Sequence, residues 1–246
     1  MDKEGKVFVV ISAGGVGSRM KGAKLPKQFL KLGGKPIIIH TIDHFEHHPM
    51  VDGIVVVCVS GWIDTFKQLA RENHYTKILA VVPGGSTGQE SIFNGVSVLH
   101  NRQDVDDDHS VVLVHDGVRP LIDETTITDC IQSVWSCGCT ATTAPSVETV
   151  INEEDGYVRE VLNREHCKLA RAPQGFRLGD FYRKHLQAKE DGINDFVDSI
   201  SLMSHYGYRI HTVDGPIENI KITTPRDFFT FKAYVDMQEV AQIWEA

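Results

Sequence analysis

The chain lacks long apolar runs and is poor in cysteine, and both features exclude whole classes of protein. None of its 246 residues belongs to a run approaching the roughly 18 apolar residues of a membrane-spanning helix. The N-terminal segment also lacks the longer apolar core of a signal peptide. The five cysteines are odd in number and have no C-x-x-C spacing. This argues against a disulfide framework and favours a cytoplasmic protein without a membrane segment.

Positive charge is scarce overall but is concentrated near the N-terminus. The formal net charge of −8 argues against a surface for general nucleic-acid binding. From Gly5 to Ile42, however, there are seven Lys or Arg residues and no Asp or Glu. A basic segment on an acidic protein predicts a local anion site, and a solvated basic face is the alternative.

The familiar phosphate-binding and catalytic signatures are missing or incomplete. No G-x-x-x-x-G-K-[ST] string of a P-loop is present. In the dinucleotide pattern G-x-G-x-x-G, Gly15 and Gly17 fit, but Met20 occupies the third position. A nicotinamide-dependent dehydrogenase is therefore disfavoured. The 12 histidines give no convincing Ser-His-Asp arrangement, and those within residues 40–48 form either a polar helix face or a metal pair.

Strand-like and helix-like patterns alternate through the first half of the chain. Runs rich in valine and isoleucine predict strands over Val7–Ser12, Gly53–Ser60, Lys77–Val82 and Ser110–His115. Helical patterns lie between them, over Ile37–His47, Ile63–Asn73 and Thr87–Leu99. This alternation predicts a single α/β domain over residues 1–246. Its core is a Rossmann-like, mainly parallel sheet with helices on both faces.

The pattern changes after Thr140. Short β-prone pieces without a crossover helix predict a projecting β-arm or hairpin over residues 140–172. Further elements are predicted at Leu178–Lys189 (helix), Asp198–His205 (helix) and Tyr208–Val213 (strand). A last helix is predicted from Pro225, with Thr224 as its N-cap. The aromatic residues of this helix are predicted to join the core.

The segment after the first strand carries the clearest chemistry. It reads Ser12-Ala-Gly-Gly-Val-Gly-Ser-Arg-Met20, and its glycines let backbone N–H groups approach phosphate. Arg19 and Lys27 can reach phosphates held there. A triphosphate and an attacking phosphate monoester together carry about six negative charges, which require fixed cations and usually Mg²⁺. The alternative is a tight turn with ordinary surface cations.

Three other segments carry candidate ligand-binding residues. Two of them follow predicted strands, at the sheet edge where ligands of such folds bind, and the third precedes the last helix. Asp116, in His115-Asp-Gly-Val-Arg-Pro120, can orient a ribose or support a metal, or it can cap a turn. The loop Gly84–Ser91 either recognises a base or only begins a helix. Lys221 precedes the last helix, where an ordinary solvated lysine is the alternative.

Taken in order, these segments resemble one enzyme family over nearly the whole chain. The motifs are AGGVGSRM, LPKQF, GGSTGQESI, HDGVRP, the Asn163–Arg164 pair, APQGF and ENIKIT. They are similar to those of the cytidylyltransferases that activate 2-C-methyl-D-erythritol 4-phosphate or D-ribitol 5-phosphate. The resemblance implies transfer of CMP from CTP to a polyol phosphate, with release of pyrophosphate and with Mg²⁺ as cofactor.

The resemblance also implies roles for individual residues. Those of the nucleotide site are Ala13, Gly14, Gly15, Gly17, Gly85, Ser91, Asp116 and Arg119. The catalytic cations are Arg19, Lys27 and Lys221. The residues of the polyol phosphate site are Thr149, Arg164, Asp198 and Lys221. Mg²⁺ would be held mainly by phosphates, with Asp116 as an available ligand.

A homodimer is a further implication, in which the arm lends Thr149 and Arg164 to the partner's site. The resemblance is somewhat greater to the ribitol phosphate branch of the family in three segments: LPKQF, Gly61–Trp62 and residues 220–224. D-ribitol 5-phosphate is therefore the favoured acceptor. The methylerythritol phosphate branch is the alternative, and a CTP-binding module without turnover is a more remote one. Ala172 stands where the family often has threonine, and Gly88 lies where its base-binding loop often has arginine.

Overall fold

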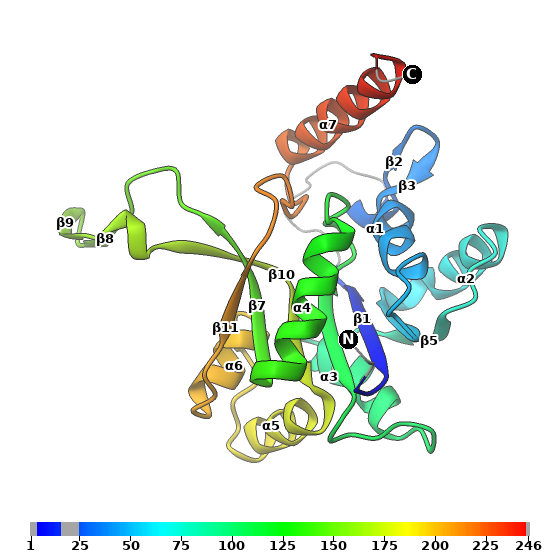
Figure 1. The fold of residues 1–246 in the computed structure, drawn as a ribbon, viewed down its shortest axis with the longest axis horizontal. Helices are drawn as coiled ribbons and strands as arrows, with labels where there is room; N and C mark the ends of the chain where they lie inside the picture. Colours follow the sequence, from blue (N-terminus) through cyan, green and yellow to red (C-terminus); the bar gives the residue numbers. More distant parts are fainter. Residues whose placement is uncertain (1–3, 16–24, 245–246) are drawn as a thin grey trace.

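The computed structural model describes residues 4–15 and 25–244, which form a layered α/β domain (Figure 1). The strands are β1 (Val7–Ala13), β2 (Lys31–Leu32), β3 (Lys35–Pro36), β4 (Gly53–Cys58), β5 (Ile78–Pro83), β6 (Val111–Asp116), β7 (Cys139–Pro145), β8 (Ile151–Glu154), β9 (Tyr157–Val161), β10 (Lys168–Arg177) and β11 (His211–Asp214). The helices are α1 (Ile37–Glu46), α2 (Ile63–Glu72), α3 (Gly88–His100), α4 (Glu124–Cys137), α5 (Leu178–Glu190), α6 (Ser199–His205) and α7 (Pro225–Trp244). Short 3-10 turns span Lys27–Phe29, Ser60–Trp62 and Arg164–His166.

One seven-stranded sheet runs through the domain in the order β11-β7-β10-β6-β1-β4-β5. Strand β10 is antiparallel to both of its neighbours, and the other adjacent pairs are parallel. The predicted mainly parallel sheet is confirmed, as are its first four strands to within two residues at each end. The fifth is displaced: β11 begins at His211, and the chain before it is irregular.

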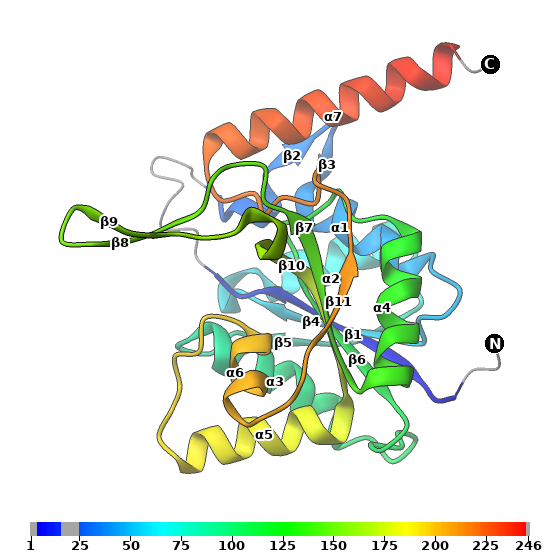
Figure 2. The same ribbon diagram turned by 60° about the vertical axis from the view of Figure 1, so that its left-hand side comes forward.

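Each central strand contributes to two apolar cores, one on each face of the sheet, because successive side chains point to opposite faces. On β1, Val7, Val9 and Ile11 pack under helices α1, α2 and α4. Phe8 and Val10 pack against α3, α5 and α6 (Figure 2). The side chains of β4 and β6 alternate in the same way, so both faces of the sheet are buried. Near-continuous valine and isoleucine runs are what a doubly covered parallel sheet requires.

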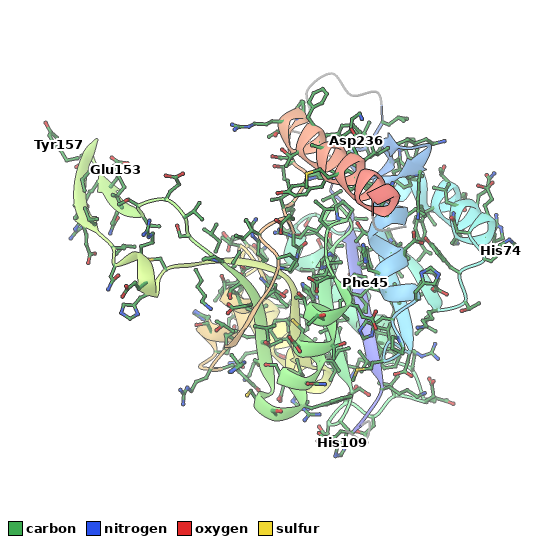
Figure 3. The ribbon with its side chains drawn as sticks, turned by 45° about the horizontal axis from the view of Figure 1, so that its top comes forward. Phe45, His74, His109, Glu153, Tyr157 and Asp236 are labelled. Atoms are coloured by element: carbon green, nitrogen blue, oxygen red, sulfur yellow. The ribbon has the colours of Figure 1, made fainter. Side chains whose placement is uncertain are left out.

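The segment predicted as an arm divides into sheet and hairpin. Its two ends belong to β7 and β10, where Thr140, Thr142 and Ala144 are buried because small and β-branched side chains fit beneath α4. Between them, β8 and β9 pair only with each other and extend away from the domain (Figure 1). Figure 3 labels Tyr157 and Glu153 at the far end of this hairpin. Every side chain of β8 and β9 is exposed.

Helix α7 begins as its cap predicts, since the Asp227 N–H donates to the Thr224 Oγ1 at 3.3 Å. Its aromatic residues, however, do not all join the core. Phe231 is buried with Leu32, while Phe229 is 68% exposed and Met237 is 64% exposed. The prediction was wrong for Phe229 because helical geometry places it, like Met237, on the face away from Phe231.

Candidate active site

A glycine turn, Ala13–Gly15, leaves the carboxyl end of β1 and lies against the loop after β5. A Cβ atom on Gly14 would come 3.1 Å from the Cα of Gly84, and the converse holds for Gly84. Such a contact is tighter than most Cβ contacts, so a side chain at either position would require the two segments to shift apart by a few tenths of an ångström. Of the predicted phosphate-binding residues, Gly14 is therefore closely packed, whereas a Cβ atom on Gly15 would meet nothing within 4 Å. Gly17 and Arg19 lie outside the described residues.

Two side chains hold this turn and its neighbouring loop in place. Gln28, which is buried, donates its amide N–H to the carbonyl of Ala13 at 2.7 Å and to that of Gly15 at 3.3 Å. Ser91 accepts the Gly85 N–H at 2.9 Å and donates to the Thr87 carbonyl at 2.8 Å. The residue types could be read from the sequence, but the anchoring role of Gln28 could not.

The loop Gly84–Ser91 leads into α3, whose start agrees with the predicted capping pattern. The Thr87 Oγ1 accepts the Glu90 N–H at 3.1 Å. The N-terminal turn of α3, where the helix dipole is positive, therefore lies opposite the glycine turn across the same cavity. Such an end favours a bound anion.

Asp116 ends β6 and pairs with two cations. Its carboxylate contacts the Arg119 Nε at 2.8 Å and the Lys221 Nζ at 2.6 Å. Arg119 also donates to the Asn219 carbonyl at 3.0 Å, which links β6 to the chain before α7. Burial alone would raise the pKa of Asp116, but Lys221 and Arg119 outweigh it and hold that pKa well below its usual range. The carboxylate stays ionised at neutral pH.

His115 precedes this aspartate but cannot exchange protons near neutral pH. Burial lowers the pKa of His115 to about 3. Its Nε2 lies 3.1 Å from the Arg119 carbonyl, and its Nδ1 has no partner among the described residues. The imidazole is a neutral core group, consistent with the absence of a histidine-based triad from the sequence.

Two adjoining cavities open at this edge of the sheet. The first, which we call the glycine-turn cavity, measures about 480 Å³ and is lined by the predicted residues Ala13, Gly14, Gly15, Lys27, Gly85 and Ser91. The second, the arginine cavity, measures about 280 Å³ and is lined by Arg119, Arg171, Gln174, His185, Phe196 and Asp198. Both are bounded by Ser12, Gly88, Asp116 and Lys221. A ligand in one cavity therefore borders a ligand in the other.

The arginine cavity is held open by a hydrogen-bonded frame. Asp198 caps α6 by accepting the Ser201 N–H at 2.9 Å. Gln174 donates to Asp198 at 3.3 Å and accepts the N–H groups of Ser199 and Ile200. Gln174 belongs to the APQGF motif, but its contact with the cap of α6 depends on tertiary structure.

Thr149 and Arg164 are not brought to either cavity within one chain. Both lie on the exposed segment that leads into and out of the β8–β9 hairpin. Arg164 donates to the Val147 carbonyl at 3.3 Å, still within this segment. The residue that sequence reasoning missed is Arg171, which lines the arginine cavity and is the first residue of the chain's R-A-P-Q-G-F string.

The described residues contain no group of three or more metal-ligating side chains. The helical histidines bind backbone carbonyls instead: His40 Nε2 lies 3.2 Å from that of Leu32, and His44 Nε2 lies 3.0 Å from that of Pro120. In the structure, both imidazole rings are therefore hydrogen-bonded to backbone carbonyls.

The fold and its two edge cavities are those of a nucleotide-binding α/β protein. The family model for 2-C-methyl-D-erythritol 4-phosphate cytidylyltransferase, IspD, matches residues 7–237, and the chain belongs to this family. The predicted enzyme class, a cytidylyltransferase, is thereby confirmed. None of the described helices is long and apolar enough to cross a membrane.

Known relatives of this chain are named for two different acceptor substrates. A ribitol-5-phosphate cytidylyltransferase of Vibrio parahaemolyticus is 48% identical over 96% of this chain and 98% of its own. A 2-C-methyl-D-erythritol 4-phosphate cytidylyltransferase of Desulforamulus reducens is 36% identical over 94% of this chain and 96% of its own. The crystal structure of 4-diphosphocytidyl-2C-methyl-D-erythritol synthase from Anaerococcus prevotii superposes with a TM-score of 0.82 at 25% identity, covering 95% and 97% of the two chains.

Proposed function

We propose that this enzyme transfers CMP from CTP to D-ribitol 5-phosphate, giving CDP-ribitol and pyrophosphate. The glycine-turn cavity takes the nucleotide, and the arginine cavity takes the acceptor. The observation that supports this assignment is the wall of Asp116 and Lys221 that the two cavities share, because ligands bound in these cavities would border each other. The higher identity to relatives named for ribitol 5-phosphate supports this acceptor over methylerythritol phosphate.

The chemistry requires positioning and charge rather than a proton acceptor. An oxygen of the acceptor phosphate attacks the α-phosphorus of CTP, forming a new P–O bond. The bond from that phosphorus to the bridging oxygen breaks, and pyrophosphate leaves with the electron pair. Because the attacking phosphate is already close to a dianion at neutral pH, no general base is needed. Lys27 and Arg19 stabilise charge on the triphosphate.

Mg²⁺ fits this site only as a companion of the nucleotide. Asp116 is the one carboxylate that lines both cavities among the described residues, and it already pairs with Arg119 and Lys221. The part of the chain that the structure describes therefore offers no ready set of metal ligands here. We propose that CTP brings the ion on its own phosphates, where the ion offsets negative charge.

The acceptor side is completed by a second copy of the chain. The hairpin exposes Val147, Tyr157, Val158 and Val161, which is unusual for a surface that stays in water. We propose that this arm packs on a partner and brings Thr149 and Arg164 to the partner's arginine cavity. The five unpaired cysteines support a reducing, cytoplasmic setting for the enzyme.

The test is pyrophosphate release with CTP and each polyol phosphate in turn. We expect the highest kcat/KM with D-ribitol 5-phosphate and a product whose mass is that of CDP-ribitol. A higher kcat/KM with 2-C-methyl-D-erythritol 4-phosphate would reassign the acceptor. Tight CTP binding without pyrophosphate release, whatever the acceptor, would support a nucleotide-binding module instead.

A further inference from the structure

Arg171 lines the arginine cavity and has no ion-pair partner among the described residues. The other two cations there, Arg119 and Lys221, both pair with Asp116. The guanidinium of Arg171 forms no ion pair or hydrogen bond with any other residue in the described ranges, and its Nε is buried without a partner. A half-buried guanidinium left in this state is costly unless an anion joins it.

A second guanidinium increases that cost. Burial, and then repulsion from Arg119, lower the pKa of Arg171 below its ordinary value. Both arginines line one cavity of about 280 Å³. Two like charges beside one small space form a site for a multiply charged anion, since such an anion relieves both the repulsion and the missing contacts.

The backbone that presents Arg171 is firmly held. The pairing of β10 with β7 shifts register between Ala170 and Gln174. Carbonyl groups of residues 171–173 accept hydrogen bonds from the side chains of Gln174, Asn219 and Thr142, at 3.5, 2.6 and 2.8 Å. Such irregularities re-aim side chains and often lie beside active sites. The position of Arg171 is therefore built into the sheet.

We propose that Arg171 binds the phosphate group of the acceptor in the arginine cavity; this rests on the function proposed above. A planar guanidinium binds two phosphate oxygens side by side and leaves the third free to attack. Lys221, at the wall shared with the nucleotide, offsets the charge of the approaching phosphates. Asp198, in the same cavity, accepts hydrogen bonds from polyol hydroxyls.

The test separates acceptor binding from nucleotide binding. Steady-state constants are measured for Arg171→Ala, Arg171→Gln and Arg171→Lys, with Arg183→Ala as control. Arg183 is an exposed arginine on α5 outside both cavities. We expect Arg171→Ala and Arg171→Gln to raise the KM for D-ribitol 5-phosphate at least about tenfold, as loss of a charge-assisted pair does. The KM for CTP should stay within about twofold, and Arg171→Lys should recover part of the loss, since it keeps the charge but not the fork.

Inorganic phosphate provides a second readout that does not depend on turnover of the polyol. It should compete with the acceptor in the unmodified enzyme, and its inhibition constant should rise with Arg171→Ala in proportion to the acceptor KM. An unchanged acceptor KM in a folded variant, or a rise confined to the KM for CTP, would overturn the role of Arg171 while leaving the transferase intact. Failure of the unmodified enzyme to use any polyol phosphate would overturn both proposals.

Discussion

The two cavities of this enzyme are built in different ways, although they share a wall. The glycine-turn cavity is formed largely by backbone and by residues close to the ends of β1 and β5. The arginine cavity is also bordered by β6 and α3, but it is closed by side chains of β10, α5 and α6 and of the segments before α6 and α7, which lie far apart in sequence. The comparison indicates that nucleotide chemistry is fixed by the fold, whereas acceptor choice depends on side chains that can vary. Family members named for two acceptors agree with this division.

The largest expected effect falls on the nucleotide side. Replacing Lys27 by alanine should lower kcat at least about a hundredfold with either polyol phosphate, because a preorganised cation no longer meets the transition-state charge. Rapid-quench measurement of pyrophosphate would quantify the loss. Lys31→Ala, which alters an exposed lysine on β2, is the matched control. Near-normal turnover of the Lys27→Ala enzyme would remove Lys27 from the chemistry.

The arm provides the sharpest test of the acceptor side. Arg164→Ala alone should raise the acceptor KM about tenfold. If Arg164 serves the partner's site, denaturing Arg164→Ala and Lys27→Ala chains and refolding them together should give about a quarter of normal activity, measured at an acceptor concentration well below its KM. Half of the random dimers are then mixed, and each holds one intact site. Activity no higher than the mean of the two parents would place both residues in one chain's site.

A smaller effect should follow from disturbing the glycine turn. A methyl group at residue 14 would meet the Cα of Gly84 at 3.1 Å, so the turn must shift by a few tenths of an ångström. We expect Gly14→Ala to raise the KM for CTP several-fold and to leave the acceptor KM unchanged. Gly61→Ala, where a Cβ meets open space, is the control. An equal rise in both KM values would mean that the two cavities are not independent.

The smallest effect on catalysis is expected at His185, which lies beneath the arginine cavity. Burial lowers its pKa to about 4, from about 6.5 in an unfolded chain. As the pH falls, this imidazole therefore becomes protonated at a higher pH in the unfolded state than in the folded state. The stabilising contribution is complete above about pH 6.5 and is lost as pH falls towards 4. Between pH 7 and pH 5 this histidine should account for about 2 kcal/mol of the free energy of unfolding.

Urea unfolding of His185→Gln should show a shallower loss of stability over that range. His47→Gln, at an exposed histidine, should retain the steeper profile. If His185→Gln keeps the full acid dependence, other groups carry it.

The first half of the fold could be predicted because its signals are local. Valine and isoleucine runs defined β1, β4, β5 and β6, and the caps at Thr87 and Thr224 marked two helix starts. Local patterns could not reveal which side of α7 meets the rest of the domain, so the prediction that Phe229 is buried was wrong. Nor could they locate the start of β11, whose place is set by pairing with β7.

In the candidate site too, some residues could be predicted from local sequence, whereas others are positioned by tertiary structure. Gly14, Gly15, Lys27 and Asp116 follow strands whose ends meet at one edge, so their convergence could be predicted. Arg171 owes its position to a register shift in β10, which no short sequence window encodes. Assigning Thr149 and Arg164 depended on family resemblance, since they line neither cavity in a single chain.

The most direct test is a crystal structure of the enzyme with CTP and Mg²⁺. The account predicts the triphosphate on the backbone of Gly14 and Gly15, with Lys27 in contact with its oxygens and the α-phosphorus facing the wall of Asp116 and Lys221. A nucleotide bound elsewhere, with the glycine-turn cavity filled only by water, would contradict it.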